Sequence, residues 1–125
     1  MVISPEIRAE LRAHAEEEAP NECCGLVLFR NGVAERYVRG VNQLASPYRY
    51  SLYIDPMVWA DLGDDEELEQ AIFHSHPETE PKPSRTDREN IGEWAGHPYL
   101  IYSVRRDELR AWRVSRDAVE ELPLA

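Results

Sequence analysis

Two apolar segments separated by Asn31-Gly32 constrain the fold of this chain more than any other feature of its sequence. Residues 25–30 and 33–38 are rich in the apolar and β-branched side chains that favour strands. Asn and Gly tolerate the positive φ angles of a type I′ turn, and this turn joins neighbouring antiparallel strands. The sequence therefore predicts a β-hairpin here, and with it a sheet.

The other elements follow from cap and turn residues along the chain. Ser4-Pro5 and Asp55-Pro56 each place a proline directly after an N-cap residue, and Ser84 opens a third helix. The first helix is expected to end at Pro20, and the tail from Ser115 is expected to be helical or frayed. Strands are expected at residues 50–54, 70–75, 98–104 and 108–114. Together with the hairpin, these elements predict a single α+β domain, residues 1–125, with about six strands and three helices.

The charge balance bears on the class of partner. Of the 125 residues, 24 are acidic and 14 are basic, which gives a formal net charge of −10. An excess of this sign repels nucleic-acid phosphates and anionic lipids, so neither nucleic acid nor a membrane surface is expected as a partner. No apolar run approaches the ~20 residues that cross a bilayer, and the first residues lack the layout of a secretory signal. We therefore expect a cytoplasmic protein; the sequence leaves open whether it is a monomer or a homodimer.

Cys23 and Cys24 are the only two cysteines of the chain. Neighbouring residues of a strand point to opposite faces, so a disulfide between these two would be strained. We expect one of them to be buried and the other to be exposed or redox-active. A cysteine-ligated zinc site is not expected, because a second pair of cysteines is missing.

The segment His74-Ser75-His76 carries the strongest chemical signal. Histidines at positions i and i+2 of a strand project from the same face, close enough to share one metal ion. A proline-rich loop, residues 77–83, leads from them to a helix start in which Asp87 lies one turn in. Two imidazoles and one carboxylate make an open zinc site that leaves the fourth position to water.

A site of this kind needs a proton acceptor beside the water, and Glu22 is a candidate because it precedes an apolar strand. Ser84 is a candidate donor to an oxyanion. Simpler interpretations exist for each residue: an ordinary half-buried histidine pair, a capping box formed by Ser84 and Asp87, and a surface acid at Glu22. The joint spacing of the histidines, Ser84 and Asp87 favours the metal site.

This pattern resembles the JAMM (MPN+) metallopeptidase family, whose signature is a distant Glu, His-Ser/Thr-His, seven residues, Ser, two residues and Asp. In this chain the signature reads Glu22, His74-Ser75-His76, residues 77–83, Ser84, Arg85-Thr86 and Asp87, with no departure. Residues 21–26, Asn42 with Ser46-Pro47, and residues 99–103 also resemble the family. The similarity extends from Ser4 to Val114.

The resemblance implies the JAMM/MPN fold, a cytidine-deaminase-like arrangement with a twisted mixed β-sheet flanked by helices. It implies one zinc ion per chain, held by His74, His76 and Asp87, with Glu22 as general base and Ser84 as oxyanion donor. The implied reaction is the hydrolysis of an amide bond by a peptidase or isopeptidase. Ser75 points to the opposite face of the strand and is expected to be structural.

The substrate is inferred from what surrounds the signature. Family members that cut ubiquitin chains carry long insertions after the zinc loop, whereas this chain resembles the compact prokaryotic forms. Those forms act on ubiquitin-like sulfur-carrier proteins and release cysteine or a longer peptide after the C-terminal Gly-Gly. We expect such a tail as substrate, added as a strand along residues 48–53.

Three alternatives compete with this function: a catalytically silent MPN-type scaffold, a peptidase for other peptides such as those of cell walls or phage tails, and a RadC-type domain linked to DNA repair. The complete signature argues against the scaffold. The net charge argues against the RadC type.

Overall fold

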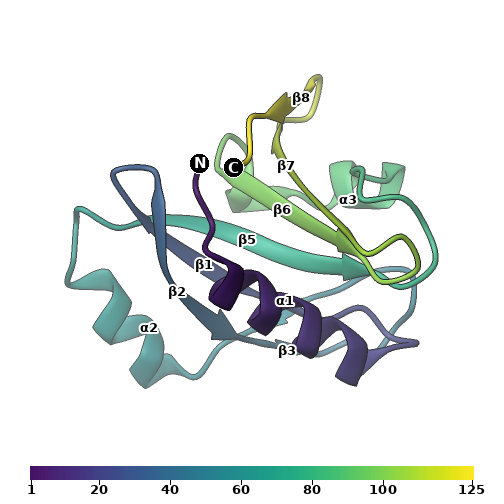
Figure 1. Ribbon diagram of the computed structural model, residues 1–125, viewed down its shortest axis with the longest axis horizontal. Coiled ribbons are helices and arrows are strands. Elements are labelled where there is room, and N and C mark those ends of the chain that lie inside the picture. The colour runs from purple at the N-terminus through teal and green to yellow at the C-terminus, as the bar shows by residue number, and fades with distance from the viewer.

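The predicted hairpin is present in the computed structural model, which describes residues 1–125 (Figure 1). Strands β1 (Cys24–Arg30) and β2 (Val33–Arg39) pair antiparallel. Between them Asn31 has a φ of 50° and Gly32 a φ of 79°. Both angles are positive, as a type I′ turn requires. The prediction from the Asn-Gly pair is therefore confirmed.

Six strands form the main sheet in the order β2-β1-β5-β6-β7-β8, and β3 and β4 form a separate two-stranded sheet. The remaining elements are α1 (Pro5–Glu18), β3 (Val41–Asn42), β4 (Leu52–Tyr53), α2 (Pro56–Gly63), β5 (Glu69–His76), α3 (Arg85–Glu89), the 3-10 helix η1 (Gly92–Trp94), β6 (Pro98–Ser103), β7 (Glu108–Val114) and β8 (Val119–Leu122). Only β5 and β6 are parallel neighbours. A parallel pair needs a crossover connection, and here the crossover contains α3 and η1.

The sheet is covered on both faces. α1 lies across one face (Figure 1), where its Leu11 joins a buried cluster with Val27 and Phe73. The adjacent strand residue Leu26 belongs to a cluster on the other face, together with Leu62 of α2. Burial on both faces explains the nearly continuous apolar sequences of β1 and β5. The predicted α+β architecture, a mixed sheet of six strands with three α-helices, is confirmed.

The start of α1 follows the local sequence. The Ser4 side chain accepts a hydrogen bond of 3.2 Å from the backbone N–H of Ile7, and Pro5 occupies the first helical position. Ile7, Leu11 and Ala15 then recur on the buried face. The helix ends at Glu18, just before Pro20, where the sequence predicts its end.

Two expectations about strands need correction. The C-terminal tail is neither helical nor frayed: β8 pairs antiparallel with β7, because the outer edge of β7 offers unpaired backbone groups. The strand expected at residues 50–54 is reduced to Leu52–Tyr53, since its partner β3 has only two residues.

The cysteine pair also differs from expectation. Cys23 and Cys24 are both buried and both free, so neither is exposed. Burial raises the pKa of each thiol to about 12, which keeps the reactive thiolate form rare. We therefore withdraw the expectation of a redox-active cysteine.

Among the helices, none has the length and apolar character that a bilayer-spanning segment needs.

Candidate metal centre

The end of β5 places His74 and His76 side by side. β5 pairs with β1 on one edge and with β6 on the other, so its backbone is held on both sides. Both histidines are buried, and their Nε2 atoms lie 3.0 Å apart. The i, i+2 spacing on a strand thus brings two imidazole nitrogens to one point.

Asp87 reaches the same point from the start of α3. The Ser84 hydroxyl accepts a hydrogen bond of 3.0 Å from the backbone N–H of Asp87, and the Asp87 carboxylate accepts one of 3.0 Å from the backbone N–H of Ser84. This capping box fixes the carboxylate at the helix start. The same Oδ2 atom lies 3.2 Å from Nε2 of His74 and 3.0 Å from Nε2 of His76. Capping and convergence on the histidines therefore occur together in this chain.

The three atoms have the spacing that a metal ion needs. Ligand atoms about 2.0–2.1 Å from a tetrahedral zinc ion stand roughly 3.3 Å from one another, close to the distances observed here. His76 also has a suitable tautomer, because its Nδ1 lies 2.8 Å from the carbonyl oxygen of Glu80. A carbonyl only accepts, so Nδ1 carries the hydrogen and Nε2 presents a lone pair to the centre.

The charges at the centre are those of a ligand set. Burial lowers the pKa of His74, which keeps this imidazole neutral. Burial by itself would raise the pKa of Asp87, but the adjacent histidines and the Ser84 N–H outweigh it and hold that pKa well below its usual range. The centre therefore holds one ionised carboxylate and a neutral His74, as a divalent cation requires.

Glu22 is carried to this centre by the pairing of β1 with β5. The backbone N–H of Cys23 donates to the Ser75 hydroxyl at 2.8 Å, and the N–H of Ser75 donates to the Cys23 carbonyl at 3.1 Å. Ser75 is thus structural, as expected, and it fixes the residue next to Glu22. Glu22 is 3% exposed, and its Oε1 lies 4.0 Å from Nε2 of His74 without a hydrogen-bond partner.

The environment of Glu22 makes its carboxyl group unusually basic. Burial, and secondly the charge of Asp87, raise the pKa of Glu22 to about 9. Oxygen and nitrogen atoms of Glu22, His74 and His76 also lie within 4.8 Å of one another, so Glu22 is a second possible ligand. The 4.0 Å gap from Glu22 to His74 exceeds the 3.2 Å from Asp87 to His74. The distances therefore favour Asp87 as the third residue that would hold an ion, and they leave the Glu22 carboxyl next to that set.

Three side chains that the sequence did not single out for a role complete the centre. The ring of Tyr50 stacks on His74 with centroids 4.5 Å apart, and its hydroxyl lies 2.8 Å from that of the buried Tyr99. The side-chain N–H₂ group of Asn42 donates to the carbonyl oxygens of Glu22 at 3.0 Å and Arg49 at 3.1 Å. The resemblance to the family covered Asn42 and, within residues 99–103, Tyr99, but it gave neither of them a role.

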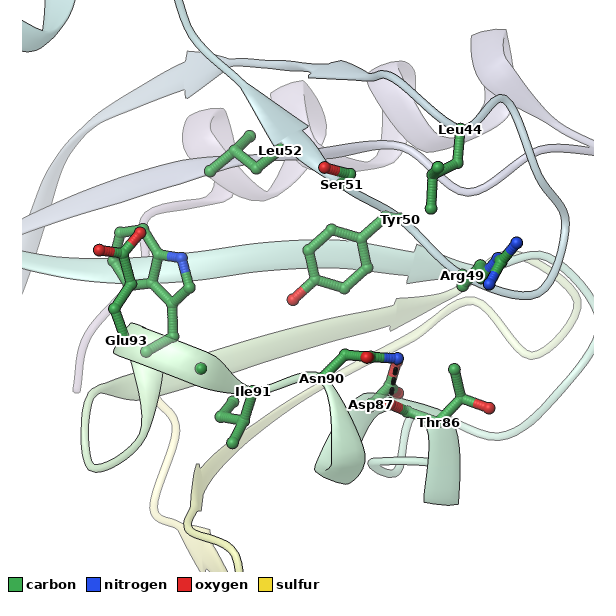
Figure 2. A pocket seen from close by; sticks show the side chains of 12 residues that line it. Leu44, Arg49, Tyr50, Ser51, Leu52, Thr86, Asp87, Asn90, Ile91 and Glu93 are labelled. Carbon is green, nitrogen blue, oxygen red and sulfur yellow. Dashed lines mark hydrogen bonds between the residues drawn. The ribbon is translucent and has the colours of Figure 1, made fainter.

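A cleft of about 480 Å³ opens beside Asp87, between β4 and the α3–η1 segment (Figure 2). Tyr50 and Leu52 form one wall, and Thr86, Asn90 and Ile91 form the opposite wall. β4 pairs with β3 on one side only, so its other edge has free backbone groups. The cleft thus offers an extended chain a strand edge next to the metal centre.

Comparison with known proteins agrees with this geometry. The family model described as "Prokaryotic homologs of the JAB domain" matches residues 4–115. A "CysO-cysteine peptidase" of Mycobacterium tuberculosis is 35% identical over 131 residues, covering 99% of this chain and 89% of the relative. A "Desampylase" of Haloferax volcanii is 33% identical over 114 residues, covering 81% of this chain and 78% of the relative.

The crystal structure of a JAB1/MPN domain protein from Archaeoglobus fulgidus has the same fold, with a TM-score of 0.64 over 99% of this chain and 96% of that one, at 17% sequence identity. The family match spans most of the chain, and the site has the residues of the JAMM signature. The chain therefore belongs to the prokaryotic JAB-domain family, as a JAMM-type metallopeptidase.

Proposed function

We propose that this protein is a zinc-dependent peptidase that hydrolyses the amide bond after the C-terminal Gly-Gly of a ubiquitin-like sulfur-carrier protein. One observation carries the proposal: three ligand atoms of His74, His76 and Asp87 lie 3.0–3.2 Å apart, with the unpaired Glu22 carboxyl 4.0 Å away. Neither helix capping nor packing explains why these four groups converge on one point. The arrangement has what metal-assisted hydrolysis needs.

His74, His76 and Asp87 would hold the ion, one per chain. Bound zinc supplies Lewis acidity, which acidifies a water molecule and polarises the substrate carbonyl. Glu22 accepts the proton of the attacking water at Oε1 and later donates it to the leaving amine. Its Oε1 has no hydrogen-bond partner within the chain and is free to accept the proton, and a bound divalent cation would favour the ionised carboxylate that this role needs.

Ser84 has a free donor for the developing oxyanion. Its oxygen accepts from the Asp87 N–H, which leaves the hydroxyl hydrogen available. The same bond anchors the Ser84 side chain next to the third ligand. A positioned hydroxyl of this kind stabilises the negative charge that forms on the carbonyl oxygen.

The substrate proposal rests on the cleft and on the names of the relatives. The free edge of β4 suits strand addition by an extended tail, and glycines at the end of that tail leave room for close backbone approach to the centre. One relative is named a CysO-cysteine peptidase and another a desampylase. Both names fit a small modifier or carrier protein as the acyl side of the bond.

The decisive experiment uses ubiquitin-like carriers with extensions after Gly-Gly. We expect mass spectrometry to show loss of the extension, to find this loss abolished by a chelator, and to find it restored by zinc. Absence of cleavage in the zinc-loaded protein would favour the scaffold alternative. Cleavage that persists in chelator would rule out the metal mechanism.

A further inference from the structure

Arg49 is a cation without a partner. Most arginines of this chain are paired, as Arg30 is with Glu35, Asp65 and Glu67. Arg49 is exposed, and its guanidinium forms no hydrogen bond or ion pair within the chain. Acidic residues outnumber basic ones by 24 to 14, so a free arginine is not explained by a shortage of carboxylates.

The backbone of Arg49 is fixed at the metal end of the cleft. Its carbonyl oxygen accepts a hydrogen bond of 3.1 Å from Asn42, which also holds the carbonyl of Glu22. The next residue, Tyr50, stacks on His74. The backbone of Arg49 is therefore linked to the candidate base through Asn42, and to a candidate zinc ligand through the neighbouring Tyr50.

The charges of the cleft are separated along its length. Arg49 is its only basic lining residue, and the acidic ones are Asp87 and Glu93. In Figure 2, Arg49 lies at the end that contains Asp87 and Thr86, while Glu93 lies at the opposite end. Asp87 is directed to the histidines. The cleft therefore presents one unpaired cation, Arg49, at the end near the metal centre, and one unpaired carboxylate, Glu93, at the far end.

We propose that Arg49 binds the free α-carboxylate of the residue that leaves, so that the enzyme releases a single C-terminal amino acid from a Gly-Gly tail. This inference rests on the proposed function and names its leaving group. In a one-residue extension, the α-carboxylate is two bonds from the nitrogen of the scissile amide, and a guanidinium matches it in charge and shape. An isopeptide-linked lysine places the whole lysine side chain between its scissile nitrogen and its backbone, and therefore has no carboxylate in that position.

The test compares two synthetic tail peptides that end in Gly-Gly-Ser, one with a free C-terminal carboxylate and one with a C-terminal amide. Serine replaces cysteine so that no thiol competes for zinc. The values of kcat/KM for both peptides are measured on the zinc-loaded wild type, on Arg49→Ala and on Arg36→Ala. Arg36 is an equally unpaired arginine on β2, away from the cleft lining, and serves as the matched control.

We expect the wild type and Arg36→Ala to prefer the free carboxylate by about tenfold, as a charge-assisted hydrogen bond allows. Arg49→Ala is expected to lose this preference, through a fall of about tenfold for the free carboxylate that exceeds any fall for the amide. An acid-to-amide ratio that is the same in wild type and Arg49→Ala would overturn the assignment of Arg49. An equal fall for both peptides would also overturn it, because it would indicate a general structural role.

A binding measurement separates this inference from the proposed function. Calorimetry of the same peptides on the zinc-free wild type and Arg49→Ala gives the acid-to-amide ratio of Kd without any turnover. If neither peptide is cleaved but the ratio depends on Arg49, the proposed peptidase activity fails and the carboxylate site stands. If both peptides are cleaved and neither ratio depends on Arg49, the activity stands and the carboxylate site fails.

Discussion

The hydroxyl groups of Tyr50 and Tyr99 lie 2.8 Å apart, and the rings of both tyrosines lie against the imidazole of His74. Tyr50 is half-buried and stacks on that imidazole, whereas Tyr99 is fully buried in the main sheet. This hydrogen bond joins the loop before β4 to strand β6. It therefore connects the cleft wall to the strand that supports the metal centre.

The burial of both hydroxyl groups predicts a cost in stability for removing either one alone. Tyr50→Phe leaves the Tyr99 hydroxyl buried without a partner, which should cost roughly 1–3 kcal/mol in the free energy of unfolding. Tyr99→Phe likewise leaves the Tyr50 hydroxyl without a partner, and because burial raises the pKa of both tyrosines, its cost should be similar. The double variant should be more stable than Tyr50→Phe alone, because no buried hydroxyl remains unpaired. Denaturant unfolding of the four proteins measures this cycle, and a double variant no more stable than either single variant would contradict it.

Glu22→Gln should separate catalysis from folding. The amide keeps the shape of the side chain but cannot accept the proton, so kcat should fall by about 100-fold or more while bound zinc is retained. In the metal-free folded protein the pKa of Glu22 is about 9, against 4.5 for an ordinary glutamate. As pH rises, the unfolded state therefore loses its proton first, and the free energy of unfolding falls between these two values. The variant lacks this loss, and at pH 8 it should be more stable than the metal-free wild type. Turnover within tenfold of wild type would reject Glu22 as the general base.

Asp87→Ala and Ser84→Ala form a matched pair, because they remove the two halves of one capping box. Each should lower the stability of the metal-free protein by roughly 1 kcal/mol through loss of the helix cap. Only Asp87→Ala should also lose stoichiometric zinc, since it alone removes an atom that faces both histidines. Elemental analysis after dialysis measures the difference. If Asp87→Ala retained zinc as well as Ser84→Ala does, Asp87 would not be a ligand.

His14 predicts a pH dependence of stability away from the metal centre. Its Nδ1 lies 2.6 Å from the Tyr37 hydroxyl, and burial, followed by the charge of Arg39, lowers the pKa of His14 to about 4. Between pH 6.5 and pH 4 the unfolded state binds a proton that the folded state does not, so this contribution to stability is present above pH 6.5 and is lost as pH falls.

The loss from His14 amounts to at most about 3 kcal/mol, at 1.36 kcal/mol per pKa unit. His14→Asn keeps a polar group for Tyr37 but does not titrate, so its stability should fall less over this range. Denaturant unfolding at several pH values compares the two proteins. Parallel pH profiles would show that His14 does not carry the effect.

Interactions between near neighbours in the chain made much of the fold predictable from the sequence. The Asn31-Gly32 turn, the Ser4 and Ser84 caps and the projection of His74 and His76 from one face each depend on a few consecutive residues. The tail was predicted wrongly because β8 forms only where an open edge of β7 is available. The third strand was overestimated for a similar reason, since the length of β4 is limited by that of β3.

The sequence by itself determined the residue types of the centre and the local geometry of its two ends, the strand with His74 and His76 and the helix start with Asp87. Only the tertiary structure decided that Glu22 lies 4.0 Å from His74, that Tyr50 covers the imidazole and that Arg49 borders the same cleft. The physical reason is that these contacts are made across paired strands and through Asn42, between segments whose separation in sequence carries no information about their distance in space.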